Sequence, residues 1–170
     1  MFRVGIGYDV HRFAVTRPLV LGGISIPYDR GLEGHSDADV LLHALADALL
    51  GALALGDIGE HFPNTDPRFR DLDSTEIVRH AYGLVRARGY HVGNVDAVVV
   101  AEEPKLSPYI PEMRKRIAEI LDTSLNRVSV KATTPERLGA LGKKEGIAAW
   151  VVVLLLSPTD SAAHDKGGPR

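Results

Sequence analysis

The 170-residue sequence contains no cysteine, and aromatic residues make up only 6% of it. Without cysteine there is no disulfide framework and no thiolate metal site, so any zinc ion would have to be held by histidine and carboxylate side chains. The longest apolar run, residues 147–156, has about half the length of a membrane span. The formal net charge is −2 at pH 7, so charge gives no reason to expect binding to nucleic acid or to an acidic membrane surface.

The two ends of the sequence differ in character. The first residues lead directly into a strand pattern and leave no room for a signal or transit peptide, so we expect a cytoplasmic protein. The length predicts one domain, which we place at residues 1–156. Small and polar residues with glycine and proline predict a disordered tail at residues 157–170.

Hydrophobic periodicity and turn residues predict a mixed α/β (α+β) domain. Ser36 is expected to cap the first helix, with Asp37 and Asp39 in its first turn. A hairpin or extended region is expected around residues 18–27, and a short turn or helix at 135–138. The expected strands lie at about 2–10, 92–101, 128–132 and 147–156, and the expected helices at about 37–54, 74–88 and 108–121.

The last expected strand, residues 147–156, shows no alternation of apolar and polar residues. Both of its faces therefore require burial. Two arrangements satisfy this requirement. Helices could cover both faces of the sheet, or the second face could pack against other subunits.

Asp9 and His11 are two positions apart in the first expected strand, so their side chains point to the same face. They lie roughly 7 Å apart along the backbone, close enough to hold one metal ion. His43 on the first helix could complete a site with three protein ligands and one open position, as in catalytic zinc sites. The alternatives are a surface pair at Asp9 and His11 and a stray histidine on a solvated helix face.

Other residues near the first helix also suit an anionic substrate. Asp39 and Asp47 are four residues to either side of His43, so either carboxylate could orient its imidazole. His35 stands at the expected helix start, where backbone N–H groups attract anions. A plain capping loop would have the same sequence.

A further group of polar residues follows the strand expected at 128–132. Thr133 and Thr134 offer hydroxyl groups for phosphoryl oxygens, and Glu136 offers a carboxylate for a phosphate-bridging Mg²⁺. The sequence alone favours a simpler interpretation, in which Thr134 caps a helix that begins at Pro135. Residues 101–106 follow another strand and could form a nucleobase pocket lined by backbone groups, or merely a loop.

Taken together, these segments resemble the 2-C-methyl-D-erythritol 2,4-cyclodiphosphate synthase family of the non-mevalonate isoprenoid pathway. The resemblance covers most of residues 3–156, in the order and at the spacing of the family. The matching blocks are GIGYDVHRF at 5–13, GHSDADVLLHALADALLGA at 34–52, LGDIGEHFPNTDP at 55–67, GYHVGNVDAVVVAEEPKLSPYI at 89–110 and VKATTPERLGALGKKEGIAA at 130–149.

The resemblance implies a four-stranded sheet packed by helices, in a homotrimer whose sheets face the trimer axis and whose active sites lie between subunits. It implies a lyase that acts on a small-molecule cytidine diphosphate substrate. The 2-phosphate of 4-diphosphocytidyl-2-C-methyl-D-erythritol 2-phosphate attacks the β-phosphorus, closes a cyclic diphosphate and expels CMP. Such phosphoryl transfer needs alignment and charge neutralisation more than a protein nucleophile.

The resemblance also implies roles for individual residues. Zn²⁺ would be held by Asp9, His11 and His43, and Mg²⁺ or Mn²⁺ by Glu136. His35 and Thr134 would be catalytic, through stabilisation of the transition state. Asp9, His11 and Glu136 would also contact substrate through their metals. The remaining substrate-binding residues would be Ser36, Asp57, Gly59, Phe62, Asp66, Ala101, Pro104, Lys105, Leu106, Thr133, Ala140 and Lys143, with residues 62–66 as a flexible wall.

Two positions depart from the family pattern. Ala140 stands where a bulky aromatic residue is frequent, and Lys143 stands where arginine is common, near the trimer axis. In some relatives this region binds an isoprenoid diphosphate in a central cavity, and lysine lacks the two-pronged contact of arginine to phosphate. Two other functions remain open: a zinc-dependent phosphohydrolase, and a non-catalytic trimeric protein that binds isoprenoid diphosphates.

Overall fold

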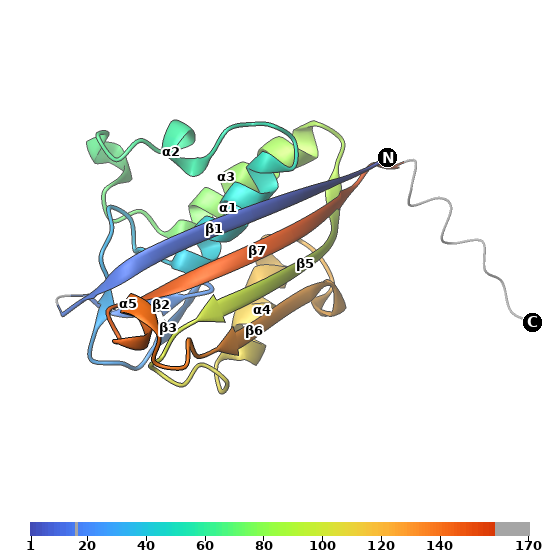
Figure 1. Ribbon diagram of the computed structural model, residues 1–170. Helices are drawn as coiled ribbons and strands as arrows, with labels where there is room; N and C mark the ends of the chain where they lie inside the picture. Colours follow the sequence, from blue (N-terminus) through green and yellow to red (C-terminus); the bar gives the residue numbers. More distant parts are fainter. Residues whose placement is uncertain (16, 159–170) are drawn as a thin grey trace, which may run out of the picture.

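The computed structural model describes residues 1–15 and 17–158 (Figure 1). Its main feature is a five-stranded sheet, one strand more than the four expected. The additional strand has two residues, Gly31 and Leu32, and pairs with the end of the first strand. The strand order is β4 (Gly31–Leu32), β1 (Phe2–Ala14), β7 (Gly146–Leu156), β5 (His91–Val100) and β6 (Val128–Thr133).

The expected helices and the expected hairpin are present. The hairpin consists of β2 (Leu19–Leu21) and β3 (Ile24–Ile26). The helices are α1 (Val40–Gly51), α2 (Ile58–His61), α3 (Ser74–Ala87), α4 (Ile110–Ile120) and α5 (Gly139–Gly142), with 3₁₀ turns at Pro67–Phe69 and Leu125–Arg127. No helix within the described residues is long and apolar enough to cross a membrane. The predicted tail at 157–170 lies, from residue 159 on, outside the described residues.

The helices cover one face of the sheet, as Figure 1 shows for α1, α3 and α4. On that face β7 buries Ile147, Ala149 and Val151 completely. In the described part of the chain nothing covers the opposite face, where seven apolar side chains are 40–69% exposed. They are Phe2, Val4, Ile6, Tyr8, Val10, Trp150 and Val152. The alternative with helices on both faces is therefore wrong.

Helix α1 packs unusually close to β1 because β1 presents glycine to it. A Cβ atom at Gly5 would lie 1.9 Å from the carbonyl oxygen of Ala48, and one at Gly7 would lie 1.9 Å from that of Ala44. Real Cβ atoms do not approach a backbone so closely, so only glycine fits at these two positions. This packing brings α1 next to the stretch of β1 that carries Asp9.

The start of α1 differs from the expectation. Asp39, not Ser36, caps the helix, and its side chain accepts hydrogen bonds from the backbone N–H groups of Leu41 and Leu42. The same carboxylate accepts from Gly22 and Gly23 of the β2–β3 hairpin at 2.9 and 2.7 Å. Burial raises the pKa of Asp39, and these N–H donors oppose the rise. Asp39 therefore ties the helix start to the hairpin and is not free to orient His43.

Candidate metal and phosphate site

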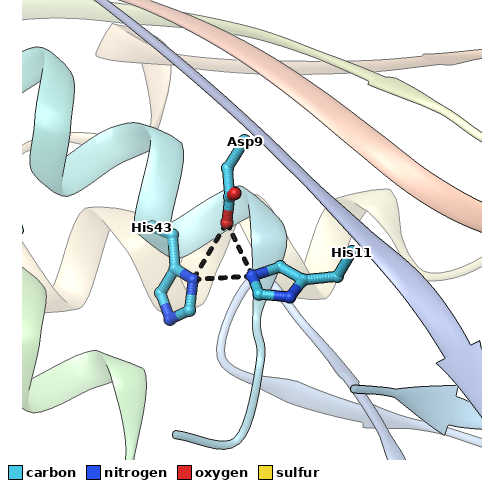
Figure 2. Close-up of side chains that lie close together, drawn as sticks. All are labelled: Asp9, His11 and His43. Atoms are coloured by element: carbon cyan, nitrogen blue, oxygen red, sulfur yellow. Dashed lines mark hydrogen bonds and ion pairs between the residues drawn. The ribbon is translucent and has the colours of Figure 1, made fainter. Parts of the chain in front are cut away.

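Asp9, His11 and His43 converge on one point (Figure 2). The Oδ2 atom of Asp9 lies 2.9 Å from Nε2 of His11 and 2.9 Å from Nδ1 of His43. The two nitrogens lie 3.2 Å apart. Donors arranged tetrahedrally around one ion at about 2.0–2.2 Å have a similar mutual separation. Strand β1 supplies two of these groups and α1 the third, as the sequence predicts.

The other nitrogen of each imidazole has an oxygen partner. Nδ1 of His11 donates to the carbonyl oxygen of Glu33 at 2.6 Å, which leaves Nε2 free for a ligand. Nε2 of His43 lies 2.9 Å from the hydroxyls of both Ser36 and Ser74, which leaves Nδ1 free. Histidines that bind metal are usually held in this way, by a hydrogen bond from the second nitrogen to an oxygen. The donor set therefore fits a divalent metal ion.

Ser74 links His43 to a carboxylate. Its hydroxyl donates to Oδ1 of Asp37, and its backbone N–H donates to Oδ2 of the same residue at 3.0 Å. Ser74 is completely buried at the first residue of α3. The prediction that Asp39 or Asp47 orients His43 is wrong, because Asp47 accepts instead from the backbone of Ile58. The role falls to two serines and Asp37.

The side chains of the triad shift one another's pKa. Burial alone would raise the pKa of Asp9, but hydrogen bonds and charge from His11 and His43 outweigh it and hold this pKa well below its usual range. Burial alone would lower the pKa of His11, but the hydrogen bond and charge of Asp9 raise it above the ordinary value of 6.5. A carboxylate is thus available as a ligand at any physiological pH.

The triad opens into a cavity of about 610 Å³. Gly34, His35 and Ser36 form one part of its wall, and Gly59 and Phe62 belong to another. Asp57 and Asp66 are not among its lining residues. Asp57 caps α2 by accepting from Glu60, and the carboxylate of Asp66 is bound by Arg68. The cavity is lined by Asp9, His11, Gly34, His35, Ser36, His43, Ile58, Gly59, Phe62, Pro63, Asn64, Thr65, Phe69, Leu72 and Ile77.

A pair of histidines attaches the wall of this cavity to α3. Nε2 of His61 donates to the carbonyl oxygen of Leu55 at 2.9 Å, and its Nδ1 faces Nε2 of His80 at 3.3 Å. The ring of Phe62 packs edge-on against His80, with 5.1 Å between centroids. Since α2 has no buried residue of its own, these contacts fix the wall that holds Gly59 and Phe62.

A second cavity, of about 410 Å³, lies at the edge of the sheet away from β1, where β5 and β6 end. Its walls are residues 101–107, with the cis peptide bond Glu103–Pro104, and residues 132–134 at the end of β6. It contains five of the predicted substrate-binding residues, namely Ala101, Pro104, Lys105, Leu106 and Thr133, together with the predicted catalytic Thr134.

No helix begins at Pro135, so the prediction that Thr134 is a helix cap is wrong. The hydroxyl of Thr134 donates instead to Oε1 of Glu136 at 2.6 Å. Glu136 and Arg137 have φ angles of 53° and 62°, which turn the chain away from a helix, and α5 begins at Gly139. Both residues are exposed, so the carboxylate and the hydroxyl are adjacent on the surface.

The two cavities are far apart within one chain. Asp9 of β1 pairs with Ala149, which also pairs with Val99, and Val99 pairs with Ala132 of β6. These four residues form one row across the sheet. Three strand spacings separate its ends, so the Asp9 and Ala132 backbones are about 14 Å apart.

A third cavity contains Ala140 and Lys143. It measures about 780 Å³ and also includes His11, Arg12, Arg30 and Lys144. His11 lines the first cavity as well, and neither Asp9 nor His43 is among the residues of the third cavity.

Sequence reasoning did not find Ser74 or Arg17. Ser74 contacts His43 from a segment 31 residues away, and the sequence marks it only as the start of a helix. Arg17 binds the backbone on both sides of His35. Neither contact has a spacing that the sequence could reveal.

Comparison with known proteins gives a consistent result. Residues 2–156 match the model of the YgbB family. A 2-C-methyl-D-erythritol 2,4-cyclodiphosphate synthase of Bacillus cereus (strain B4264) is 58% identical over 155 residues, which are 91% of this chain and 98% of that protein.

Two solved structures extend the comparison. Bifunctional IspDF from Campylobacter jejuni has a TM-score of 0.88 and 46% identity over 91% of this chain and 42% of its own. A 2C-methyl-D-erythritol-2,4-cyclodiphosphate synthase in a form bound to CDP has a TM-score of 0.84 and 40% identity, over 91% of this chain and all of its own.

Proposed function

The chain belongs to the YgbB family, and from this we propose that it converts 4-diphosphocytidyl-2-C-methyl-D-erythritol 2-phosphate to 2-C-methyl-D-erythritol 2,4-cyclodiphosphate and CMP. It is an enzyme of isoprenoid biosynthesis, a lyase that acts on a phosphorus–oxygen bond. An oxygen of the 2-phosphate forms a bond to the β-phosphorus. The bond from that phosphorus to the bridging oxygen breaks, and this oxygen leaves with CMP.

The observation that carries the proposal is the convergence of Asp9, His11 and His43 at the floor of a cavity. We propose Zn²⁺ as the bound ion, because one carboxylate and two imidazoles are a common donor set for zinc. When bound, such an ion polarises a phosphoryl oxygen and offsets its charge.

The other residues of the first cavity orient the substrate. His35 and Ser36 stand beside the triad, where an imidazole and a hydroxyl can donate to phosphoryl oxygens. Gly59 and Phe62 form the wall against which the methylerythritol unit lies. Asp57 and Asp66 are close in sequence to the residues of this wall. Their carboxylates would accept from the hydroxyl groups of the methylerythritol unit once the substrate is in place.

The second cavity takes the cytidine end of the substrate. The loop 101–106 offers backbone N–H and carbonyl groups to cytosine, and Thr133 contacts the ribose or phosphate. Glu136 would hold Mg²⁺ or Mn²⁺, and Thr134 would donate to the phosphate that transfers. A related structure has been solved in a form bound to CDP, which supports a cytidine diphosphate as the ligand.

We place the complete site between two subunits of a homotrimer. A substrate held at the same time by Glu136 and by the triad would require these groups to lie close together. Within one chain, Asp9 lies on β1 and Glu136 follows the end of β6, and the Asp9 and Ala132 backbones of these two strands are about 14 Å apart. The seven apolar side chains on the open face of the sheet supply a surface for association. Ala140 and Lys143 would then lie near the axis, in a cavity for an isoprenoid diphosphate.

The test is incubation of the purified protein with the substrate and Mg²⁺ or Mn²⁺, followed by ³¹P NMR. Equal amounts of CMP and the cyclic diphosphate are expected. His43→Ala should retain its fold and lose turnover, because one ligand of three is missing. CMP with a linear diphosphate would indicate a phosphohydrolase, and an unchanged substrate with metal bound would indicate a binding protein.

A further inference from the structure

Arg17 contacts the backbone of the loop that carries His35, residues 34–36. Its side chain is 23% exposed and is not among the residues that line the first cavity. Its guanidinium group makes three short hydrogen bonds. Nη1 donates to the carbonyl oxygen of Gly34 at 2.6 Å, and Nη2 donates to that of Ser36 at 2.5 Å and to Oδ1 of Asp71 at 2.9 Å.

Asp71 completes the attachment of the loop. Its backbone N–H donates to the carbonyl oxygen of His35 at 2.7 Å, and its φ angle of 57° is in the left-handed region. Three consecutive carbonyl groups, those of residues 34, 35 and 36, are therefore bound from one side by Arg17 and Asp71. The side chains of His35 and Ser36 line the cavity, and Ser36 reaches His43.

We infer that Arg17 is a positioning residue for the phosphoryl-transfer reaction, because it fixes the backbone on both sides of His35 without touching the substrate. The inference rests on the proposed function. The planar guanidinium offers donors at fixed angles and can bind two carbonyl groups and a carboxylate at once. A lysine ammonium at the same place is a single point charge and cannot span both carbonyl groups. Misplacement of an aligned group by about 1 Å can cost roughly 100-fold in rate.

The experiment compares Arg17→Ala and Arg17→Lys with the unaltered protein. In both variants kcat should fall by about 10–100-fold, with KM changed by less than about threefold, because the loop residues that Arg17 positions act in the transition state. Millimolar guanidinium should restore part of the kcat of Arg17→Ala, where it can occupy the vacated space, and none of that of Arg17→Lys. Arg70→Ala is the matched control, since Arg70 approaches Asp71 at 4.0 Å and has no bond to the loop.

A second readout does not depend on turnover. Amide hydrogen exchange should be faster in Arg17→Ala at Asp71, whose N–H donates to the carbonyl oxygen of His35, and at Asp37, whose N–H donates to that of Leu72. Zinc content and binding of CDP should stay unchanged. If unaltered protein gives no cyclic product, the proposed function fails, and the exchange data alone then judge the attachment of the loop.

Two results would overturn the inference: a kcat within twofold of the unaltered protein in Arg17→Ala, or a rise in KM at constant kcat, which would mean that Arg17 binds substrate directly. Should Arg17→Ala fail to fold, Arg17→Lys decides, because it keeps the charge and the aliphatic stem.

Discussion

Each histidine of the triad presents one nitrogen to the point where the three side chains converge, because its other nitrogen already has an oxygen partner. For His11 the partner of this other nitrogen is the backbone carbonyl oxygen of Glu33, whose position is fixed by the main chain. For His43 it is a pair of hydroxyls, one of which donates onward to Asp37. The chain Asp37–Ser74–His43 fixes both the tautomer and the ring plane, and it makes the imidazole a better donor to a metal.

Ser74→Ala removes the hydroxyl from this chain and leaves the backbone bond from residue 74 to Asp37 intact. The affinity for zinc should fall by about 10–100-fold, because the second nitrogen of His43 loses one of its two oxygen partners. Competition with a chromogenic chelator measures this change. Ser129→Ala on β6 is the control, and an unchanged affinity in Ser74→Ala would mean that Ser36 alone orients the ring.

The pKa shifts of the triad predict a pH dependence for metal-free protein. The lowered pKa of Asp9 stabilises the fold above its ordinary value of 3.8, and this contribution is lost as the pH falls through the lowered value. The raised pKa of His11 stabilises the fold below 6.5, and this contribution is lost as the pH rises through the raised value. Both contributions are fully present between these two ordinary values.

Above pH 6.5 the affinity for metal rises with pH while the stability of metal-free protein falls, because the ion must displace the proton of His11. The difference in Tm between zinc-loaded and metal-free protein should therefore grow as the pH rises from about 6 to 8. Thermal unfolding in a pH series measures it. A constant difference would show that His11 is not protonated in metal-free protein over this range.

The site depends on the close packing of α1 against β1, since β1 carries Asp9 and His11 and α1 carries His43. Gly7→Ala places a methyl group 1.9 Å from the carbonyl oxygen of Ala44, so β1 and α1 must separate. The free energy of unfolding should fall by about 1–3 kcal/mol or more, as in other overpacked cores, and zinc affinity should fall with it. Chemical denaturation and chelator competition measure both.

Gly83→Ala provides the comparison, because a Cβ at that position in α3 meets no atom within 4 Å. It should raise stability by about 0.5–1 kcal/mol, as glycine is unfavourable inside a helix. If Gly7→Ala left stability unchanged, the close approach of the two elements would not be required.

Most elements could be predicted from the sequence because their signals are local. The periodicity of α3 and the apolar run of β7 are sufficient to place them within one or two residues. The start of α1 could not be predicted, since Asp39 is held by Gly22 and Gly23 of a hairpin that the helix does not adjoin in sequence. Strand β4 was not predicted either, because a two-residue strand exists only through its pairing with β1.

The same distinction holds for the candidate site. The spacing of Asp9 and His11 in one strand is a local signal that makes them a candidate pair. His43 lies 32 residues further on in a helix, and the resemblance to the family assigns it to the triad. Arg17 and Ser74 act through contacts whose partners come from other elements. The prediction of a helix cap at Thr134 failed because capping motifs are common in sequences, whereas the left-handed turn at Glu136 is set by its tertiary surroundings.

For the whole molecule, the separation of the two cavities predicts that inactive variants can restore one another. In a trimer with composite sites, His43→Ala damages the half of the site on β1 and α1, and Glu136→Gln damages the half beyond β6. In randomly mixed trimers about a quarter of the sites would combine two intact halves. Activity of the mixture should therefore exceed that of either variant alone.

The measurement requires that subunits exchange, so the two variants are co-expressed with different tags and mixed species are isolated before assay. The control is the double variant, His43→Ala with Glu136→Gln, co-expressed with both tags, because every subunit of its trimers carries both substitutions. Mixed trimers without any gain in activity would place the whole site within one chain, and a monomeric protein in light scattering would contradict the composite site directly.

The position of β7 in the sheet affects the order in which the strands can pair during synthesis. This strand lies at the centre of the sheet, between β1 and β5, yet among the described residues it is the last strand to be synthesised. At roughly 5–20 residues per second, β1 waits on the order of ten seconds on the ribosome for its long partner. Throughout that interval its apolar edge and face are open to other nascent chains. Production of this protein should therefore respond to slower translation and to chaperone supply more than its size suggests.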